Sequence, residues 1–158
     1  MKGVERAMLN LGYIYEYGRC GKPDHQKAFM QYAKVAALTG HTEALYKMGD
    51  MYSRAKVVEQ DLRTAYRLYE SSLEAACDNV VALAQPAIRL AKLVSNPDNR
   101  SWDIPYDPMR ALALYQLAER GLRIDIARGQ TYYTGRLKEA IEGQERMRVV
   151  LDKPGIVL

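Results

Sequence analysis

The chain has 158 residues, of which 48% are hydrophobic, and its formal net charge is +4. This length is enough for one ordinary domain or one short solenoid with a buried core. Acidic and basic residues alternate, as in residues 136–148, so we expect solvated helix faces and no nucleic-acid partner. With no apolar run of signal-peptide or membrane-spanning length, the sequence predicts a cytoplasmic protein without membrane contact.

Helical periodicity starts near Val4 and continues through the stretch AMLNLGYIYEYG, residues 7–18. Gly12 interrupts this helix, where alanine would be more stable by about 1 kcal/mol. The following GRCGKPD, residues 18–24, has glycines suited to helix ends and an aspartate suited to the next N-cap. A second helix then ends near Gly40. We therefore predict a helix–turn–helix unit over about residues 4–40.

The same pattern recurs 37 positions later, which predicts a second unit over about residues 41–78. The matched pairs are Ala7 and Ala44, Leu11 and Met48, Gly12 and Gly49, Tyr15 and Tyr52, Asp24 and Asp61, Ala28 and Ala65, Phe29 and Tyr66, and Tyr32 and Tyr69. A glycine at a fixed place in each unit indicates that neighbouring helices approach closely there. We expect Tyr15 and its copies to fill the adjacent gap.

Two later units follow the pattern more loosely. The third spans about residues 82–121, with Ala91 in the place of the glycine and a second helix ending near Gly121. An insertion near residues 95–106 makes its turn about a dozen residues longer than needed. A capping unit over residues 122–152 is predicted to contain a further first helix at residues 126–135, with Gly129 as the repeated glycine, and a closing helix. Residues 153–158 form a frayed tail or a cut edge. Together the units make one repeat domain over residues 1–158.

The repeated pattern is Ala-x-x-x-Leu-Gly-x-x-Tyr-x-x-Gly, then Asp-x-x-Lys-Ala-x-x-x-Tyr and a closing Ala-Ala-x-x-Gly. It resembles the Sel-1-like repeat, a relative of the tetratricopeptide repeat. The resemblance implies an all-α fold, a right-handed α/α superhelix or solenoid of antiparallel helix pairs. It also implies an adaptor that gathers protein partners, commonly in bacterial signalling or secretion. Cys20 and Cys77 do not provide the paired cysteines of the secreted, disulfide-rich branch of this family.

Candidate catalytic residues are not apparent, and we expect no enzyme activity, no cofactor and no metal site. His25 and His41 fall at predicted turns or helix starts, where solvent-facing or capping roles suffice. The GRCGK loop, residues 18–22, lacks the Gly-Lys-Ser/Thr ending of a phosphate-binding loop. Two alternatives stay open. The chain could be the docking or regulatory arm of a larger enzyme or of a secretion or signalling protein, or a cell-wall-related hydrolase like the cysteine-rich relatives.

In stacked helix pairs the first helices line the concave face, so we expect partner-binding residues between their packing positions. These candidates are Arg6, Asn10, Tyr13, Tyr17, Glu43, Lys47, Asp50, Arg54, Arg89 and Lys92. We expect them to be exposed. Tyrosine and arginine often anchor protein interfaces, and bases outnumber acids in this set. The predicted partner is therefore a protein or peptide segment with some negative charge. The apolar end, residues 146–158, could also dock onto a second copy and form a homodimer.

Overall fold

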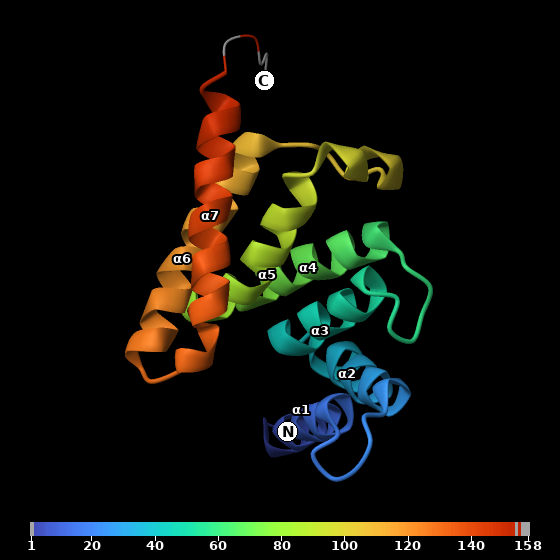
Figure 1. Ribbon diagram of the computed structural model, residues 1–158. Helices are drawn as coiled ribbons and strands as arrows, with labels where there is room; N and C mark the ends of the chain where they lie inside the picture. Colours follow the sequence, from blue (N-terminus) through green and yellow to red (C-terminus); the bar gives the residue numbers. More distant parts are fainter. Residues whose placement is uncertain (1, 154, 156–158) are drawn as a thin grey trace. The chain divides into compact units, whose positions relative to one another are not determined.

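The computed structural model describes residues 2–153 and residue 155, and within them the secondary structure is helical, with no strand (Figure 1). The fold is all-α and consists of helices packed in adjacent antiparallel pairs, the α/α-solenoid class that the sequence predicts. The helices are α1 (Lys2–Tyr17), α2 (His25–Thr39), α3 (Thr42–Ser53), α4 (Leu62–Ala76), α5 (Val80–Val94), α6 (Pro108–Ala127) and α7 (Thr134–Leu151), with short 3₁₀ turns η1 (Pro97–Trp102) and η2 (Thr131–Tyr133).

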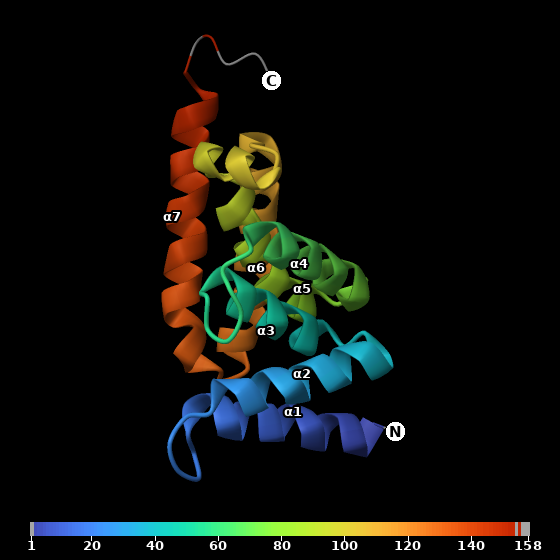
Figure 2. The same ribbon diagram turned by 90° about the vertical axis from the view of Figure 1, so that its right-hand side faces the viewer.

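Two compact units make up the chain, Met1–Ala75 and Ala76–Leu158. In the first unit α2 packs against both α1 and α3, and α4 is joined to α3 by hydrogen bonds. In the second unit α6 packs against both α5 and α7. Each unit is thus held together by a second helix that lies between two neighbours, as Figure 2 shows for α2.

The N-cap predicted at Asp24 is confirmed, and two further aspartates cap α4 and α6 in the same way. The carboxylate of Asp24 accepts the backbone N–H of Lys27 at 3.0 Å. Asp61 and Asp107 accept the backbone N–H of the third following residue, each at 2.9 Å. These bonds satisfy N–H groups that have no partner within the helix, which explains why an aspartate recurs at the start of α2, α4 and α6.

The same backbone hydrogen bond recurs in the first three helix–turn–helix repeats and fixes their register. The N–H of each capping aspartate donates to the carbonyl of Tyr15, Tyr52 and Val94, at 2.8, 3.1 and 2.9 Å respectively. Val94 therefore takes the place of Tyr15, as the sequence predicts. Residue 24 follows residue 15 by nine positions and residue 107 follows residue 94 by thirteen, so the insertion has four residues. The expected dozen is wrong, because the first two repeats also need eight residues between the corresponding positions. Part of the longer segment forms η1.

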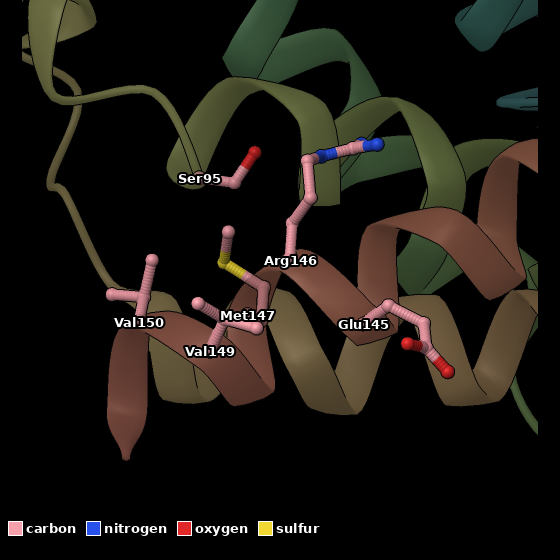
Figure 3. Close-up of a pocket in the computed structure, with 6 residues that line it drawn as sticks. All are labelled: Ser95, Glu145, Arg146, Met147, Val149 and Val150. Atoms are coloured by element: carbon pink, nitrogen blue, oxygen red, sulfur yellow. The ribbon is translucent and has the colours of Figure 1, made fainter. Parts of the chain in front are cut away.

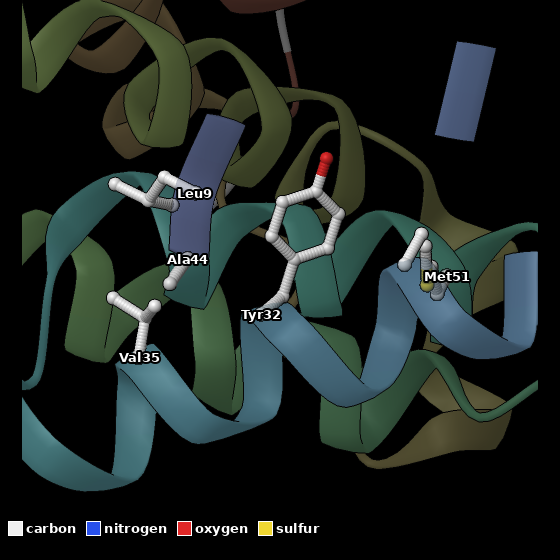
Figure 4. Close-up of a cluster of buried hydrophobic side chains, with 6 residues drawn as sticks. Leu9, Tyr32, Val35, Ala44 and Met51 are labelled. Carbon is white, nitrogen blue, oxygen red and sulfur yellow. The ribbon is translucent and has the colours of Figure 1, made fainter. Parts of the chain in front are cut away.

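Close approach at the repeated glycines is confirmed, but the ring that fills the gap comes from a different helix. A Cβ atom on Gly12 would lie 2.5 Å from Cε1 of Tyr32, and one on Gly49 would lie 2.5 Å from Cε1 of Tyr69. The expectation that Tyr15 fills this gap is wrong. Tyr32 is fully buried and points from α2 into a cluster with Leu9, Val35, Ala44 and Met51 (Figure 4).

The predicted capping unit is only partly right. The closing helix exists as α7, but residues 126–135 do not form a further first helix. They comprise the end of α6, a turn, η2 and the start of α7. α6 does not end near Gly121, because this glycine lies against the Val80 carbonyl and Ala84 of α5 and the helix continues to Ala127. Gly129 has φ +97° and no neighbour near its Cβ position, so it makes the turn and is not a copy of Gly12.

Gly143 of α7 takes the packing role that Gly129 was expected to have. A Cβ atom at Gly143 would lie 2.5 Å from Cζ of Tyr115, which is 1% exposed on α6. The tyrosine-on-glycine contact is therefore present in the second unit, between different elements. Of the predicted tail, residues 154 and 156–158 lie outside the described residues.

We predict that Gly12→Ala lowers the free energy of unfolding by about 1–3 kcal/mol, because the added methyl group overlaps the buried Tyr32 ring. Gly135→Ala is the matched control. It lies in α7 with open space around its Cβ position, so this substitution should leave stability unchanged or raise it slightly. Urea unfolding followed by circular dichroism measures both. Equal effects of the two substitutions would contradict the close-approach interpretation.

Candidate protein-binding site

Helices α1 and α3 of the first compact unit bring five side chains together. We call this group the Tyr–Lys cluster: Tyr13, Glu16, Tyr17, Glu43 and Lys47. Tyr13 and Tyr17 are one turn apart on α1, and their rings stack with centroids 6.0 Å apart and an interplanar angle of 8°. Lys47 of α3 places its Nζ 4.8 Å from the Tyr13 centroid and 5.1 Å from that of Tyr17. The ammonium group thus holds two stacked rings through cation–π attraction.

Hydrogen bonds satisfy the charges of this cluster. Lys47 Nζ lies 3.0 Å from Glu16 Oε2 and also donates to the Tyr17 hydroxyl at 3.0 Å. The Tyr13 hydroxyl donates to the Glu43 carboxylate, and the Tyr32 hydroxyl donates to Glu16 at 2.6 Å. Each charged group in the cluster therefore has a partner of opposite charge or a hydroxyl, which fixes the positions of the two rings.

The structure separates the ten predicted site residues by exposure. The exposed ones are Arg6, Asn10, Tyr17, Arg54 and Lys92, and Tyr13 and Glu43 are partly buried. The expectation of exposure is wrong for Lys47, Asp50 and Arg89, which are 7%, 8% and 8% exposed.

Each of the three buried residues makes contacts that explain its position. Lys47 forms the ion pair with Glu16 described above. Asp50 accepts the Tyr69 hydroxyl at 2.8 Å. Arg89 donates to the backbone oxygen and to Oε1 of Gln85, at 3.0 and 2.8 Å. Long polar side chains between the packing positions thus reach neighbouring groups and are covered.

Among the predicted residues, Tyr13, Tyr17, Glu43 and Lys47 are brought together. Arg89 and Lys92 lie on α5 in the second unit, where Lys92 Nζ pairs with Glu139 of α7 at 2.5 Å. Sequence reasoning missed Glu16 and Tyr32. Glu16 lies one turn beyond Tyr13 on α1, which was the available signal, but its partner Lys47 is 31 positions away in the chain.

The tyrosines of this region have shifted acidity. Burial raises the pKa of Tyr13 well above its usual value near 10, and the neighbouring Tyr46 and Glu43 raise it further. For Tyr32, burial and the hydrogen bond to Glu16 raise the pKa in the same direction. Both hydroxyls therefore stay protonated and donate to carboxylates in the folded protein.

Among residues 2–153 and 155, no group of three or more His, Cys, Asp or Glu side chains could hold a metal ion. None of the described helices is long and apolar enough to cross a membrane. Cys20 and Cys77 are both exposed.

Comparison with known proteins decides the family. The Sel1 repeat family matches residues 5–38, 42–77 and 95–121, which together make up more than half of the sequence. The chain belongs to the Sel1 repeat family. Sel1 repeats generally act as protein-interaction modules, and proteins of this family are typically non-catalytic scaffolds.

A solved structure agrees with this assignment at the level of the fold. The crystal structure of a Sel1 repeat protein from Oxalobacter formigenes is similar to this chain, with a TM-score of 0.60 and 24% sequence identity. The similarity covers 92% of this chain and 58% of that protein, so the chain spans little more than half the length of its structural relative.

The Sel1 pattern distinguishes packing residues from residues particular to this chain. Gly12 and Tyr32 belong to the repeated set, and their copies Gly49 and Tyr69 make the same contact. Tyr13 and Tyr17 have no tyrosine 37 positions later, where Asp50 and Arg54 stand. The stacked pair is therefore not needed for Sel1 packing and is a feature of this chain's first repeat.

A second surface feature lies at the end of α7 in the second unit. Ser95, at the end of α5, and five residues of α7 line an open hollow of about 480 Å³ (Figure 3). The α7 residues are Glu145, Arg146, Met147, Val149 and Val150. Most of its lining is apolar, and Val149 is 60% exposed. Met147, Val149 and Val150 of this hollow belong to the apolar C-terminal end noted in the sequence.

We predict that the free energy of unfolding falls as pH rises above about 10. Tyr13 and Tyr32 keep their protons in the folded state, whereas they ionise near pH 10 when unfolded, so the native state binds more protons. Each of these two tyrosines should lower the free energy of unfolding by about 1.4 kcal/mol per pH unit above pH 10. Tyr32→Phe should make the decline shallower, as measured by urea unfolding between pH 8 and 11. An unchanged slope in this variant would contradict the assignment.

Proposed function

We propose that this Sel1 repeat protein binds a protein segment on the surface formed by α1 and α3, with Tyr17 as the anchor. The observation that carries the proposal is the exposure of Tyr17, which is 54% exposed although the position of its ring is fixed by Tyr13 and Lys47. A large aromatic side chain that is already ordered loses little conformational entropy when it binds. Tyrosines in such positions often contribute most of the binding energy of an interface.

Charge supports a partner with acidic side chains. Two acidic residues of the Tyr–Lys cluster are engaged within the first unit, since Glu16 pairs with Lys47 and Glu43 accepts the Tyr13 hydroxyl. Arg6 on α1 and Arg54 at the end of α3 are exposed on the same helices. An acidic segment that crosses these helices would meet an exposed cationic group on each of them. The proposed role is that of an adaptor with no catalytic step of its own.

To test this proposal, a photo-crosslinking amino acid at position 17 would capture the partner, and titration calorimetry would then measure its affinity. We expect Tyr17→Ala to weaken binding by at least tenfold, and Arg54→Glu to weaken it by a similar factor. Both residues are exposed, so circular dichroism should show an unchanged helical content. Lys47 is a poor probe because its replacement also breaks the ion pair with Glu16.

Tyr132→Ala is the matched control for this experiment. Tyr132 is 70% exposed and lies in η2 of the second unit, outside the proposed surface. Full affinity in Tyr17→Ala together with loss of affinity in Tyr132→Ala would contradict the proposal and would show that the partner does not bind on α1 and α3.

We also propose a cytoplasmic location and self-association through the end of α7. Two exposed cysteines without a framework of paired cysteines favour a reducing compartment.

The apolar hollow at Met147, Val149 and Val150 favours contact with a second copy. In sedimentation experiments over a concentration series, dimers should form and Val149→Glu should disperse them. Strictly monomeric wild-type protein would rule out this interface.

A further inference from the structure

Two consecutive turns of the first unit present basic side chains that the Tyr–Lys cluster does not use. The turn between α1 and α2 carries Arg19 and Lys22, and the turn between α3 and α4 carries Arg54 and Lys56. We call these four residues the basic edge. All four are exposed, and none of them has an acidic partner among the residues that the structure describes.

The two turns hold a cation at the same place in the backbone. The N–H of Arg19 donates to the carbonyl of Ile14, and the N–H of Lys56 donates to the carbonyl of Met51, each at 3.1 Å. Both donors and both acceptors are 37 positions apart in the chain. Arg19 and Lys56 therefore occupy one structural position in two neighbouring repeats.

The backbone does not require a cation at this position. In the third repeat Val94 takes the place of Tyr15, so Asp98 stands where Arg19 stands in the first repeat. An acidic residue is thus compatible with the same turn. Because the side chains of the basic edge are exposed, packing does not account for their charge either.

The first helices bring the two turns to one end of the unit. Tyr13 and Tyr17 of α1 form hydrogen bonds with Glu43 and Lys47 of α3, and the members of each pair are 30 positions apart. The two helices therefore run in the same direction, and the turns that follow them lie on the left of Figure 2. Tyr17 is the last residue of α1, so the basic edge continues directly from the proposed binding surface.

The acidic residues of these turns do not balance the basic edge. Asp24 and Asp61 cap α2 and α4, and their carboxylates accept backbone N–H groups of those helices. Glu59 is exposed and stands 37 positions after Lys22. In these two turns, all of whose residues the structure describes, four exposed cations thus face one exposed acid.

We propose that the basic edge binds a run of acidic residues in the same partner segment that contacts Tyr17. This inference rests on the proposed function and adds the composition of the partner. A single exposed ion pair contributes little to affinity, so several neighbouring cations favour several carboxylates in sequence. The partner segment therefore carries one group that packs on the Tyr17 ring and, beside it, consecutive Asp or Glu residues.

An acidic polypeptide fits the basic edge better than a nucleic acid does. Nucleic-acid surfaces use dense clusters of basic residues, whereas the net charge of the whole chain is only +4. The edge also adjoins an ordered tyrosine, a residue type that often anchors protein interfaces.

The test uses N-acetyl hexaglutamate, which carries the acidic run but no group for the Tyr17 ring. Titrated into the isotope-labelled chain, this peptide should shift the backbone amide resonances of residues 18–22 and 54–57 together. The shifts give its dissociation constant. Arg19→Glu combined with Lys56→Glu should raise that constant at least tenfold. Both side chains are exposed, so circular dichroism should show an unchanged helical content.

Lys2→Glu combined with Lys34→Glu is the matched control. These lysines are exposed in the same unit, one at the start of α1 and the other in the second half of α2, away from both turns. The change in net charge is identical, and the dissociation constant should stay within twofold. Equal weakening by the two double variants would overturn the proposal, because the peptide would then respond to net charge alone. So would binding of an oligonucleotide or of phosphatidylserine vesicles by a chain that does not bind hexaglutamate.

One further variant separates this inference from the proposed function. Tyr17→Ala should leave the affinity for hexaglutamate unchanged, because this peptide offers nothing to the ring. A partner that is crosslinked at position 17 and keeps full affinity for the Arg19→Glu, Lys56→Glu chain would overturn the inference alone. Specific binding of hexaglutamate without any partner captured at position 17 would support the acidic-run site and count against the proposed function.

Discussion

The packing of a tyrosine ring on a glycine backbone is the constraint on which both units depend. Tyr32 on Gly12, Tyr69 on Gly49 and Tyr115 on Gly143 each leave no room for a side chain at the glycine. A ring placed there brings two helices close enough for the residues around it to become buried. In the first unit these include Leu9 and Val35, with 1% and 0% exposure. The helical cost of glycine, about 1 kcal/mol, is offset by burial of a large aromatic side chain.

This arrangement also determines where polar groups can lie. The buried rings carry hydroxyl groups that need acceptors, and carboxylates at the same level of the first unit supply them. Glu16 accepts from Tyr32, and Asp50 accepts from Tyr69. Glu16 in turn holds Lys47, which lies over Tyr13 and Tyr17. The exposed Tyr17 is therefore linked to the core through Lys47, Glu16 and Tyr32, so the proposed binding surface is ordered by the same contact that orders the fold.

The sequence predicts elements well where local chemistry determines them. The aspartate caps and the glycine at residue 40 depend on groups close together in the chain, and the structure confirms them. Gly121 shows where this reasoning fails. A glycine late in a helix can end the helix or make room for a neighbouring helix. Gly121 does the second, because it lies against the carbonyl of Val80, 41 positions earlier in the chain. Only the tertiary structure contains that information.

The expected exposure of three candidate residues failed for a related reason. Positions between the packing residues were expected to be exposed, yet Lys47, Asp50 and Arg89 are buried. Long polar side chains lose exposure when a partner lies within reach, and such partners are distant in sequence, as Glu16 is from Lys47. Tyr17 is exposed as expected, whereas Tyr13, which also has no tyrosine copy in the next repeat, is partly buried.

The same repeat position can be buried in one helix and exposed in another. Ala7 and Ile14 of α1 stand 37 positions before Ala44 and Met51 of α3, which are 0% and 2% exposed. Ala7 itself is exposed and Ile14 is partly exposed. The repeat pattern therefore determines which positions are apolar, whereas the neighbouring helices determine which of them are covered.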